Sequence, residues 1–167
     1  RIHVEQDAGK SIHDMHDALS LIDLNRAGMP LLELVTKPVL FSIDHVAAFI
    51  TEIQKVVRFL GISDGNMEAG SLRCDANISV KRKGEAQLGQ KVEIKNMNSV
   101  RHIKKALDFE FTRQANMLEA GETVLSESRL FDVAKGMTME MRDKEEAHDY
   151  RYFPDPDLAP VSIADDK

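Results

Sequence analysis

The sequence predicts an α+β fold in which a mainly antiparallel sheet carries two long helices on one face. Short alternating or apolar segments, which are typical of strands, occur in clusters along the 167 residues. Two long segments with apolar residues every three or four positions lie between these clusters and indicate amphipathic helices. Because strands and helices do not alternate strictly, the pattern is not that of a doubly wound fold, and it favours an antiparallel sheet.

Three segments before the first helix have the pattern of strands. Residues 1–8 alternate weakly, and residues 19–24 alternate well enough to predict a half-buried strand. Residues 31–35 are apolar apart from Glu33. We expect a buried strand there, because the apolar run is too short for a helix and Pro38 bounds it.

The two helices have clear start and stop signals. Ser42 and Ser99 are good N-caps, and Gly61 and Gly121 follow the periodic segments. The positions expected to face the core are Val46, Phe49, Ile50, Ile53, Val57 and Leu60 in the first helix, and Ile103, Leu107, Phe111, Ala115 and Leu118 in the second.

Four further strand candidates flank the second helix. They are residues 71–81, 91–95, 123–131 and 137–141. Gly84 and Gly89 lie between the first two candidates, which predicts a hairpin. Met137, Met139 and Met141 alternate along the last candidate, and either core packing or a partner surface explains this pattern.

The composition restricts the classes of function. With 43% hydrophobic residues, the chain is large enough for one domain with its own core. Its net charge of -6 excludes a global basic field, so any contact with nucleic acid would use local basic groups. The single cysteine, Cys74, excludes an internal disulfide and a cysteine-based zinc cage, and it favours a reducing, cytosol-like compartment. No segment approaches the roughly 18 consecutive apolar residues of a membrane span.

Several strand candidates carry charge where a core strand would be apolar. Glu33 either points to water at a sheet edge or is a carboxylate on the sheet floor, suited to Mg²⁺. Arg73 and Asp75 would share one face of a strand, as would Glu93 and Lys95. These residues form solvent-facing ion pairs or line a wet cleft, since an unpaired buried charge is costly.

Two other segments suggest ligands more weakly. Residues 7–11 (DAGKS) lack the first glycine of a phosphate-binding loop, so we reject that motif. Residues 150–154 (YRYFP) concentrate aromatic side chains, and they either anchor the tail to the core or form a stacking platform. We favour the anchor, with Arg151 as the member that reaches a ligand. The residues alone therefore indicate a cleft of mixed charge on a sheet, for a metal and a phosphate.

Seven segments, in this order, resemble the B subunit of the aspartyl/glutamyl-tRNA amidotransferases. They read EQDAGKS (5–11), SLIDLNR (20–26), GMPLLE (28–33), SDGNME (63–68), GSLRCDANIS (70–79), KVEIKN (91–96) and HDYRYFP (148–154). Because the segments are long, ordered and spread over nearly the whole chain, coincidence does not explain them.

The resemblance implies a glutamine-synthetase-like cradle domain whose floor is an antiparallel sheet. It also implies a ligase that uses ATP and Mg²⁺ to phosphorylate the side-chain carboxylate of Glu on tRNA(Gln) or Asp on tRNA(Asn). Ammonia from glutamine, released by the partner amidase (A) subunit, then forms the amide. The implied partners are this amidase, a small C subunit and the misacylated tRNA, with no membrane. The implied location is the bacterial cytoplasm, with an organellar origin also open.

The resemblance also implies roles for individual residues. Glu33 matches a metal ligand, and Glu5 and Asp7 are further metal candidates because Gln6 stands where the family usually has an acid. The catalytic candidates are Arg73, Glu93, Lys95 and Arg151. The cofactor-binding candidates are Lys10, Asp75, Asn77, Asn96 and Asn98. His3 has no partner at a recognisable spacing.

The resemblance further predicts that residues 1–167 are the central part of the cradle domain. On this interpretation the chain lacks an N-terminal strand that carries a Glu and a His of the metal site, and also the C-terminal helical and tRNA-binding domains. We therefore expect it to be inactive alone. An alternative is a non-catalytic module that docks the amidase and the tRNA acceptor end. A free-standing ATP-dependent enzyme is disfavoured because the chain offers too few acidic ligands.

Overall fold

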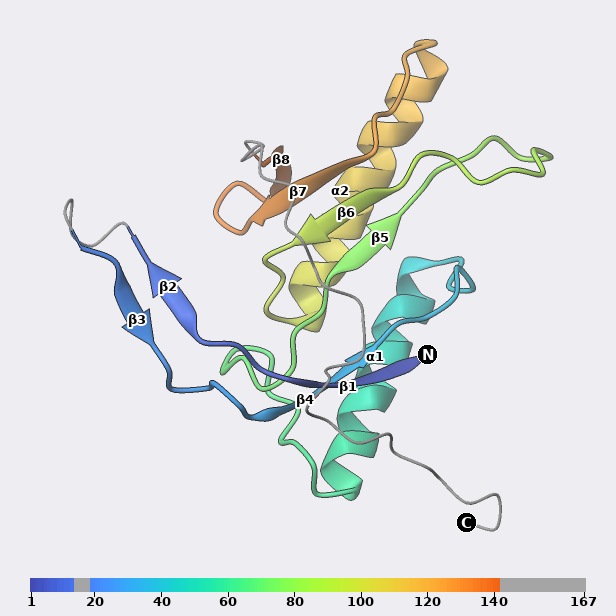
Figure 1. Ribbon diagram of the computed structural model, residues 1–167. Helices are drawn as coiled ribbons and strands as arrows, with labels where there is room; N and C mark the ends of the chain where they lie inside the picture. Colours follow the sequence, from blue (N-terminus) through green and yellow to red (C-terminus); the bar gives the residue numbers. More distant parts are fainter. Residues whose placement is uncertain (14–18, 142–167) are drawn as a thin grey trace.

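The computed structural model describes residues 1–13 and 19–141 and has an α+β architecture, as predicted (Figure 1). Its elements are β1 (Ile2–Gln6), β2 (Lys10–Ile12), β3 (Leu21–Asp23), β4 (Pro30–Leu34), α1 (Ile43–Phe59), β5 (Ala76–Ile78), β6 (Val92–Lys95), α2 (Val100–Glu119), β7 (Glu127–Asp132) and β8 (Met137–Glu140). The strands form a four-stranded sheet and two separate two-stranded ribbons.

The four-stranded sheet has the order β5-β6-β7-β8. Its pairs are antiparallel except β6 and β7, which are parallel because α2 carries the chain from one to the other. Val92, Ile94 and Phe131 lie on the face toward α2 and are almost fully buried. Ile94 and Phe131 belong to the core cluster that includes Ile103 and Leu107 of α2. Helix α2 thus covers one face of this sheet.

The opposite face of the sheet is here called the open face. It carries the residues that alternate along each strand with those facing α2. Its residues are Asn77, Glu93, Lys95, Ser128, Leu130, Asp132, Met137 and Met139. Met137 and Met139 are 36% and 40% exposed, so core packing does not explain their alternation. The predicted strand over residues 71–81 is shorter in the structure, where only Ala76–Ile78 pair with β6.

Both helices begin and end where their capping residues predict. The Ser42 and Ser99 side chains accept hydrogen bonds from the backbone N–H groups of His45 and His102. Gly61 and Gly121 follow the C-caps with φ of 67° and 77°, a conformation that favours glycine. Helix α1 packs against α2.

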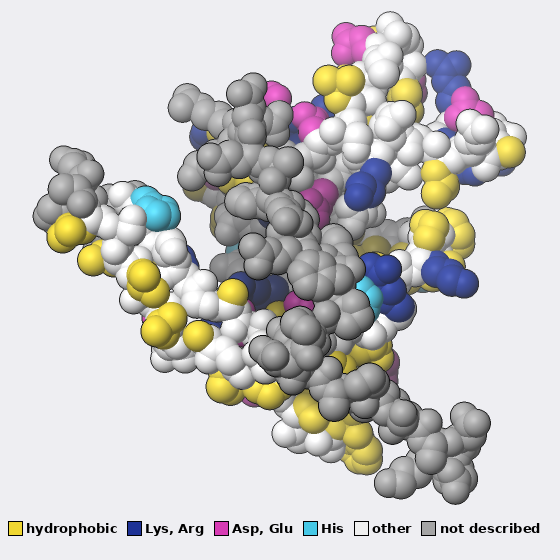
Figure 2. All heavy atoms as spheres, viewed as in Figure 1, with side chains coloured by type: hydrophobic (Ala, Val, Ile, Leu, Met, Phe, Trp, Pro, Cys, Tyr) yellow, Lys and Arg dark blue, Asp and Glu magenta, His cyan; other side chains and the backbone are white. Residues whose placement is uncertain are grey.

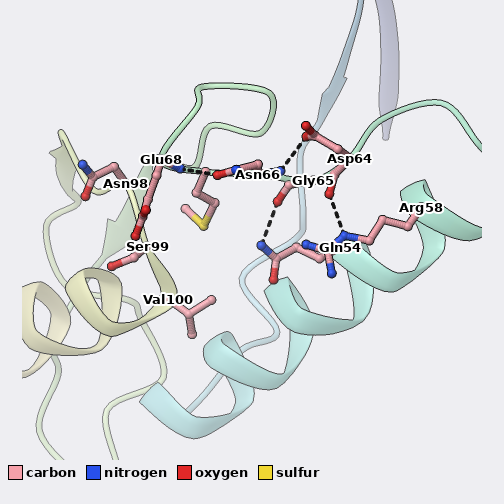
Figure 3. A pocket seen from close by; sticks show the side chains of 10 residues that line it. Gln54, Arg58, Asp64, Gly65, Asn66, Glu68, Asn98, Ser99 and Val100 are labelled. Atoms are coloured by element: carbon pink, nitrogen blue, oxygen red, sulfur yellow. Dashed lines mark hydrogen bonds between the residues drawn. The ribbon is translucent and has the colours of Figure 1, made fainter.

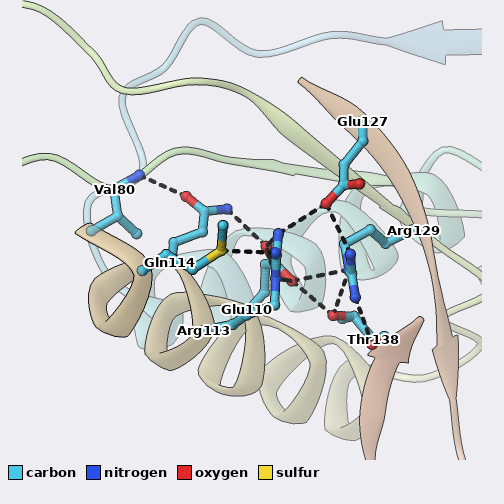
Figure 4. Close-up of polar contacts among 8 residues, drawn as sticks. Val80, Glu110, Arg113, Gln114, Glu127, Arg129 and Thr138 are labelled. Carbon is cyan, nitrogen blue, oxygen red and sulfur yellow. Dashed lines mark hydrogen bonds and ion pairs between the residues drawn. The ribbon is translucent and has the colours of Figure 1, made fainter. Parts of the chain in front are cut away.

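The predicted core face of α2 is only partly right. Ile103 and Leu107 are buried, but Phe111 is 51% exposed. The buried stripe instead continues through Glu110 and Gln114, whose exposed fraction is zero. The buried polar side chains Glu110 and Gln114 thus lie one position before Phe111 and Ala115, which were expected to face the core. They remain buried because a polar network satisfies their hydrogen-bonding groups (Figure 4).

Glu110 is the centre of this network. Its carboxylate accepts hydrogen bonds from Arg113 Nη2 at 2.6 Å, Thr138 Oγ1 at 2.7 Å and Gln114 Nε2 at 2.9 Å. Gln114 in turn accepts a hydrogen bond from the backbone N–H of Val80 at 3.1 Å. The network thus connects α2 to β8 and to the segment that follows β5.

A second carboxylate extends the network to β7. Glu127 accepts a hydrogen bond from Arg129 Nη1 at 2.8 Å and one from Arg113 Nη2 at 3.1 Å. Burial acts to raise the pKa of Glu110, but the hydrogen bonds from Arg113, Gln114 and Thr138 outweigh it and leave this pKa below its ordinary value. Glu110 is therefore a buried, ionised and fully paired group.

In the two-stranded ribbons, two segments that were predicted to be buried or half-buried are exposed. Residues 31–35 do contain a strand, β4, but Leu32 and Leu34 are 51% and 45% exposed. The predicted half-buried strand over residues 19–24 is the exposed strand β3. Figure 2 shows hydrophobic side chains along the outer edge of these ribbons. The apolar pattern of residues 31–35 correctly predicts the strand β4, but in the described part of the chain no element packs onto the exposed side of this strand.

Neither α1 nor α2 has the length and apolar character that a helix needs to cross a membrane.

Candidate functional site

Pairing of β1 with β4 brings a histidine and two carboxylates together. The register places His3 opposite Glu33, and alternation puts Glu5 on the same face of the ribbon as His3. His3 Nδ1 lies 2.9 Å from Glu33 Oε2. One potential ligand atom from each of the three residues lies within 4.8 Å of the other two. We call these three residues the ligand group.

The chemistry of the ligand group suits a divalent cation. Carboxylate oxygens are the donors that Mg²⁺ prefers, and an imidazole nitrogen widens the choice to transition metals. The side chains of His3 and Glu33 are 36% and 50% exposed, which leaves room for water or phosphate oxygens beside a bound ion. The Glu33 carboxylate faces solvent, and it also belongs to a group of residues that could hold a metal ion.

His3 is the residue that the sequence analysis missed. The sequence offers no partner for His3 at a recognisable spacing, and in the structure its partner Glu33 lies 30 positions away. Only the register between β1 and β4 joins the two. A possible signal was the alternation of His3 and Glu5 on the predicted first strand, which places both on the face that Glu33 meets.

Two other residues of the first segment lie outside the ligand group. Gln6 pairs with Pro30 and, by alternation, lies on the opposite face of the ribbon from His3 and Glu5. Asp7 is a predicted metal ligand, but its carboxylate binds Arg26 Nε at 2.8 Å. Having Gln6 in place of an acidic residue therefore does not reduce the number of carboxylates in the ligand group.

Arg26 connects the ribbon to the body of the protein. Besides its ion pair with Asp7, it donates a hydrogen bond from Nη1 to the carbonyl oxygen of Gly70 at 3.1 Å. Asp7 also exchanges backbone hydrogen bonds with the turn before β4, through Gly28 and Met29. This chain of contacts positions the ribbon that carries the ligand group relative to the loop after α1.

A second charged group lies on and beside the open face of the sheet. Lys95 Nζ is 3.2 Å from Asp75 Oδ2 and 3.4 Å from Glu93 Oε2, and Ser128 Oγ donates a hydrogen bond to Glu93 Oε2 at 2.9 Å. Burial acts to lower the pKa of Lys95, but the charges and hydrogen bonds of Asp75 and Glu93 outweigh it and raise this pKa. Lys95 is thus held as a cation between two carboxylates.

The other predicted site residues are dispersed. Asn77 lies opposite Glu93 on the open face, and Arg73 is an exposed residue of the loop before β5. Asn96 has a φ of 67° and donates a hydrogen bond from its amide to the carbonyl oxygen of Phe131, so it shapes the end of β6. Lys10 lies on β2, opposite Asp23. Arg151 and the aromatic segment 150–154 lie outside the described residues.

Asn98 lines a cavity of about 400 Å³ between α1, the loop after it and the start of α2 (Figure 3). Its side-chain oxygen lies 2.6 Å from His102 Nδ1. Two other polar side chains there also bind the protein itself: Gln54 donates to the carbonyl oxygen of Gly65 and Arg58 to that of Asp64. This cavity therefore lies at a junction between elements.

Cys74 is expected to be an unreactive thiol. Burial, together with the charge of Asp75, raises its pKa to about 11. At pH 8 only about one thiol in a thousand would then be ionised, and the thiolate is the nucleophile. We expect iodoacetamide to label native Cys74 at least about tenfold more slowly than a free cysteine, whose pKa is about 8.5. Peptide mapping by mass spectrometry measures this rate, and equal rates in native protein and in urea would contradict the prediction.

Comparisons with known proteins match this chain over its whole length. The family model described as "GatB/GatE catalytic domain" matches residues 1–167. The chain is 55% identical over 164 residues to the B subunit of the aspartyl/glutamyl-tRNA(Asn/Gln) amidotransferase of Anaeromyxobacter dehalogenans (strain 2CP-1 / ATCC BAA-258), covering 98% of this chain and 34% of the relative. The B subunits of the same name from Myxococcus xanthus (strain DK1622) and Pelagibacter ubique (strain HTCC1062) are each 52% identical, with 98% and 99% of this chain covered and 34% of each relative. The chain thus spans about a third of the length of these relatives.

Proposed function

This chain belongs to the family of GatB/GatE catalytic domains, and from that membership we propose that it activates the side-chain carboxylate of a misacylated tRNA with ATP. The substrates would be Glu on tRNA(Gln) or Asp on tRNA(Asn), in keeping with the names of the relatives. The amidase subunit of the same complex would supply ammonia, and a small C subunit would complete the assembly.

The ligand group on the β1–β4 ribbon carries this proposal. In the proposed first step, a carboxylate oxygen of the substrate bonds to the γ-phosphorus of ATP, the bond to the β–γ bridging oxygen breaks, and ADP leaves. Ammonia then attacks the acyl carbon, phosphate departs with the bonding electrons, and the nitrogen loses a proton to give the amide. A bound Mg²⁺ would supply charge neutralisation at the phosphate oxygens.

The residues of this chain would position and neutralise charge. His3, Glu5 and Glu33 would hold the cation by their nitrogen and oxygen atoms, which already lie close together. Lys95 would stabilise negative charge on the transferred phosphoryl group. Asp75 and Glu93 hold its ammonium group in place, at 3.2 and 3.4 Å.

The Lys95→Ala variant of the full-length protein, in its complex, tests the proposal. The assay supplies Glu-tRNA(Gln), ATP, Mg²⁺ and free ammonium, so that the amidase reaction is bypassed. We expect tRNA-dependent ADP release to fall by about 100-fold, the usual scale for removal of one charge-stabilising group. Lys105→Ala, which changes an exposed lysine of α2, is the matched control. Normal turnover of Lys95→Ala would favour the alternative function, a docking module for the amidase and the tRNA acceptor end.

A further inference from the structure

A positively charged segment connects β5 to β6 and extends beyond the end of the four-stranded sheet (Figure 1). We call residues 81–91, whose sequence is KRKGEAQLGQK, the basic arm. The arm contains four cationic side chains and a single carboxylate, that of Glu85, in a chain whose net charge is -6. All four cationic residues, Lys81, Arg82, Lys83 and Lys91, are exposed. The arm is therefore a local region of positive charge on a negatively charged chain.

The base of the arm is held in place by the rest of the fold. The backbone N–H of Val80 donates a hydrogen bond to the buried side chain of Gln114 on α2. Arg82 Nη2 donates to the carbonyl oxygen of Leu118, near the end of the same helix, at 2.8 Å. A Cβ atom at Gly89 would collide with the carbonyl oxygen of Val80, so the two sides of the arm approach closely at its base. The position of the arm relative to α2 is thus defined.

The positive charge of the arm is not neutralised by carboxylates in the described part of the chain. Lys81 Nζ and Arg82 Nη2 both donate to backbone carbonyl oxygens, those of Glu85 and Leu118. Over residues 1–13 and 19–141, no cationic side chain of the arm forms an ion pair. Lys95, by contrast, is held between two carboxylates. The arm therefore offers its charge to an anionic partner.

The composition of the arm favours the phosphates of a nucleic acid over its bases. Residues 81–91 contain no aromatic side chain on which a base could stack. Lysine and arginine contacts to phosphates position a nucleic acid without reading its sequence. Lys91 precedes β6 and Lys95 is the last residue of that strand, so the two are about 13 Å apart along an extended chain. One tRNA molecule can therefore contact the arm and also reach the charged group around Lys95.

We propose that the basic arm binds phosphate groups in the sugar–phosphate backbone of the tRNA. This inference rests on the proposed function, in which tRNA carries the substrate carboxylate. It adds a binding surface that lies outside both the ligand group and the charged group around Lys95. Because phosphates are common to all tRNAs, we expect the same contribution for tRNA(Gln) and tRNA(Asn).

The double variant Lys83→Ala/Lys91→Ala of the full-length protein, in its complex, tests this inference. Lys81 and Arg82 are left unchanged because their side chains also bind the protein itself. The affinity for Glu-tRNA(Gln) is measured by filter binding at several salt concentrations, and we expect it to fall by about tenfold or more at about 0.1 M salt. The slope of log affinity against log salt concentration should become shallower by about 1.4–1.8, since each phosphate contact contributes about 0.7–0.9.

Two matched double variants control for the change in charge. Lys83→Arg/Lys91→Arg keeps both positive charges and should retain the wild-type affinity and slope. Lys55→Ala/Lys135→Ala removes the same charge from two lysines that are 65% and 58% exposed, and it should bind tRNA like the wild type. If this second control lost as much affinity as the arm variant, net charge rather than the arm would control binding, and the inference would be overturned.

The release of ADP separates the arm from the proposed function. Wild-type affinity and slope in the arm variant overturn the inference, while tRNA-dependent ADP release by the wild-type complex still supports the proposed function. If the wild type binds tRNA but releases no ADP, the proposed function fails, and weaker binding by the arm variant still supports the arm. Size-exclusion chromatography tests a protein partner. Loss of a subunit from the arm variant, with unchanged tRNA affinity of the complex that remains, would assign the arm to that subunit and overturn the inference.

Discussion

Glu110→Ala is expected to lower the free energy of unfolding by about 3–5 kcal/mol, the usual cost of breaking a buried ion pair. The carboxylate is fully buried and accepts hydrogen bonds from Arg113, Gln114 and Thr138. Its removal leaves the Arg113 guanidinium, only 20% exposed, with one carboxylate partner instead of two. Urea unfolding of the full-length chain, followed by far-UV circular dichroism, measures this loss.

Glu119→Ala is the matched control, because Glu119 is an exposed glutamate at the end of the same helix. A surface substitution of this kind should change stability by no more than about 0.5 kcal/mol. If the two variants were equally stable, the network around Glu110 would contribute little to the fold.

The Glu110 network should also make stability depend on pH. Because its pKa is lowered in the folded protein, its contribution is fully present above the ordinary glutamate pKa of about 4.3. That contribution is lost as pH falls through the lower folded pKa. Glu110→Gln should therefore flatten the dependence of unfolding free energy on pH below about 4.3. Asp44, Asp64 and Asp132 also have lowered pKa values, but both proteins retain them, so the difference isolates Glu110.

Glu33→Gln is expected to reduce ATP-dependent amidation by about 100-fold or more, since it removes charge from the group proposed to hold the metal. An amide keeps the size of the side chain but is a weaker ligand for Mg²⁺, and His3 loses its carboxylate partner at 2.9 Å. The measurement is the formation of amidated tRNA from Glu-tRNA(Gln), ATP and free ammonium by the complete complex. Assembly of the complex is checked by size-exclusion chromatography.

The Mg²⁺ dependence of the rate separates a metal ligand from a structural residue. Glu33→Gln should raise the Mg²⁺ concentration needed for half-maximal rate, whereas Lys95→Ala should leave it close to the wild-type value. Glu52→Gln, on the exposed side of α1, controls for loss of a surface carboxylate. Near-normal turnover of Glu33→Gln would show that this carboxylate is only a solvent-facing strand residue and would favour the docking module.

The helices and the hairpin were predictable because their signals are local. Ser42 and Ser99 cap the helices, and Gly61 and Gly121 follow them, within a few residues of the backbone groups that they affect. The antiparallel pairing of β5 with β6 likewise follows from two short segments joined by the connection over residues 79–91. The family was also evident in the sequence, since its motifs are runs of neighbouring residues.

Contacts between distant segments were not predictable in this way. The periodicity of α2 predicts Phe111 in the core, but the rotation of the helix buries Glu110, and partners on α2 itself, β7 and β8 make that burial tolerable. The exposure of β4 depends on which elements pack against it, and the sequence pattern of an apolar strand does not contain that information. His3 and Glu33 become partners through the register of two strands, although 30 positions separate them. Caps, turns and periodicity act through neighbouring residues and can be read along the chain, whereas strand register and helix rotation are decided by the packing of the whole fold.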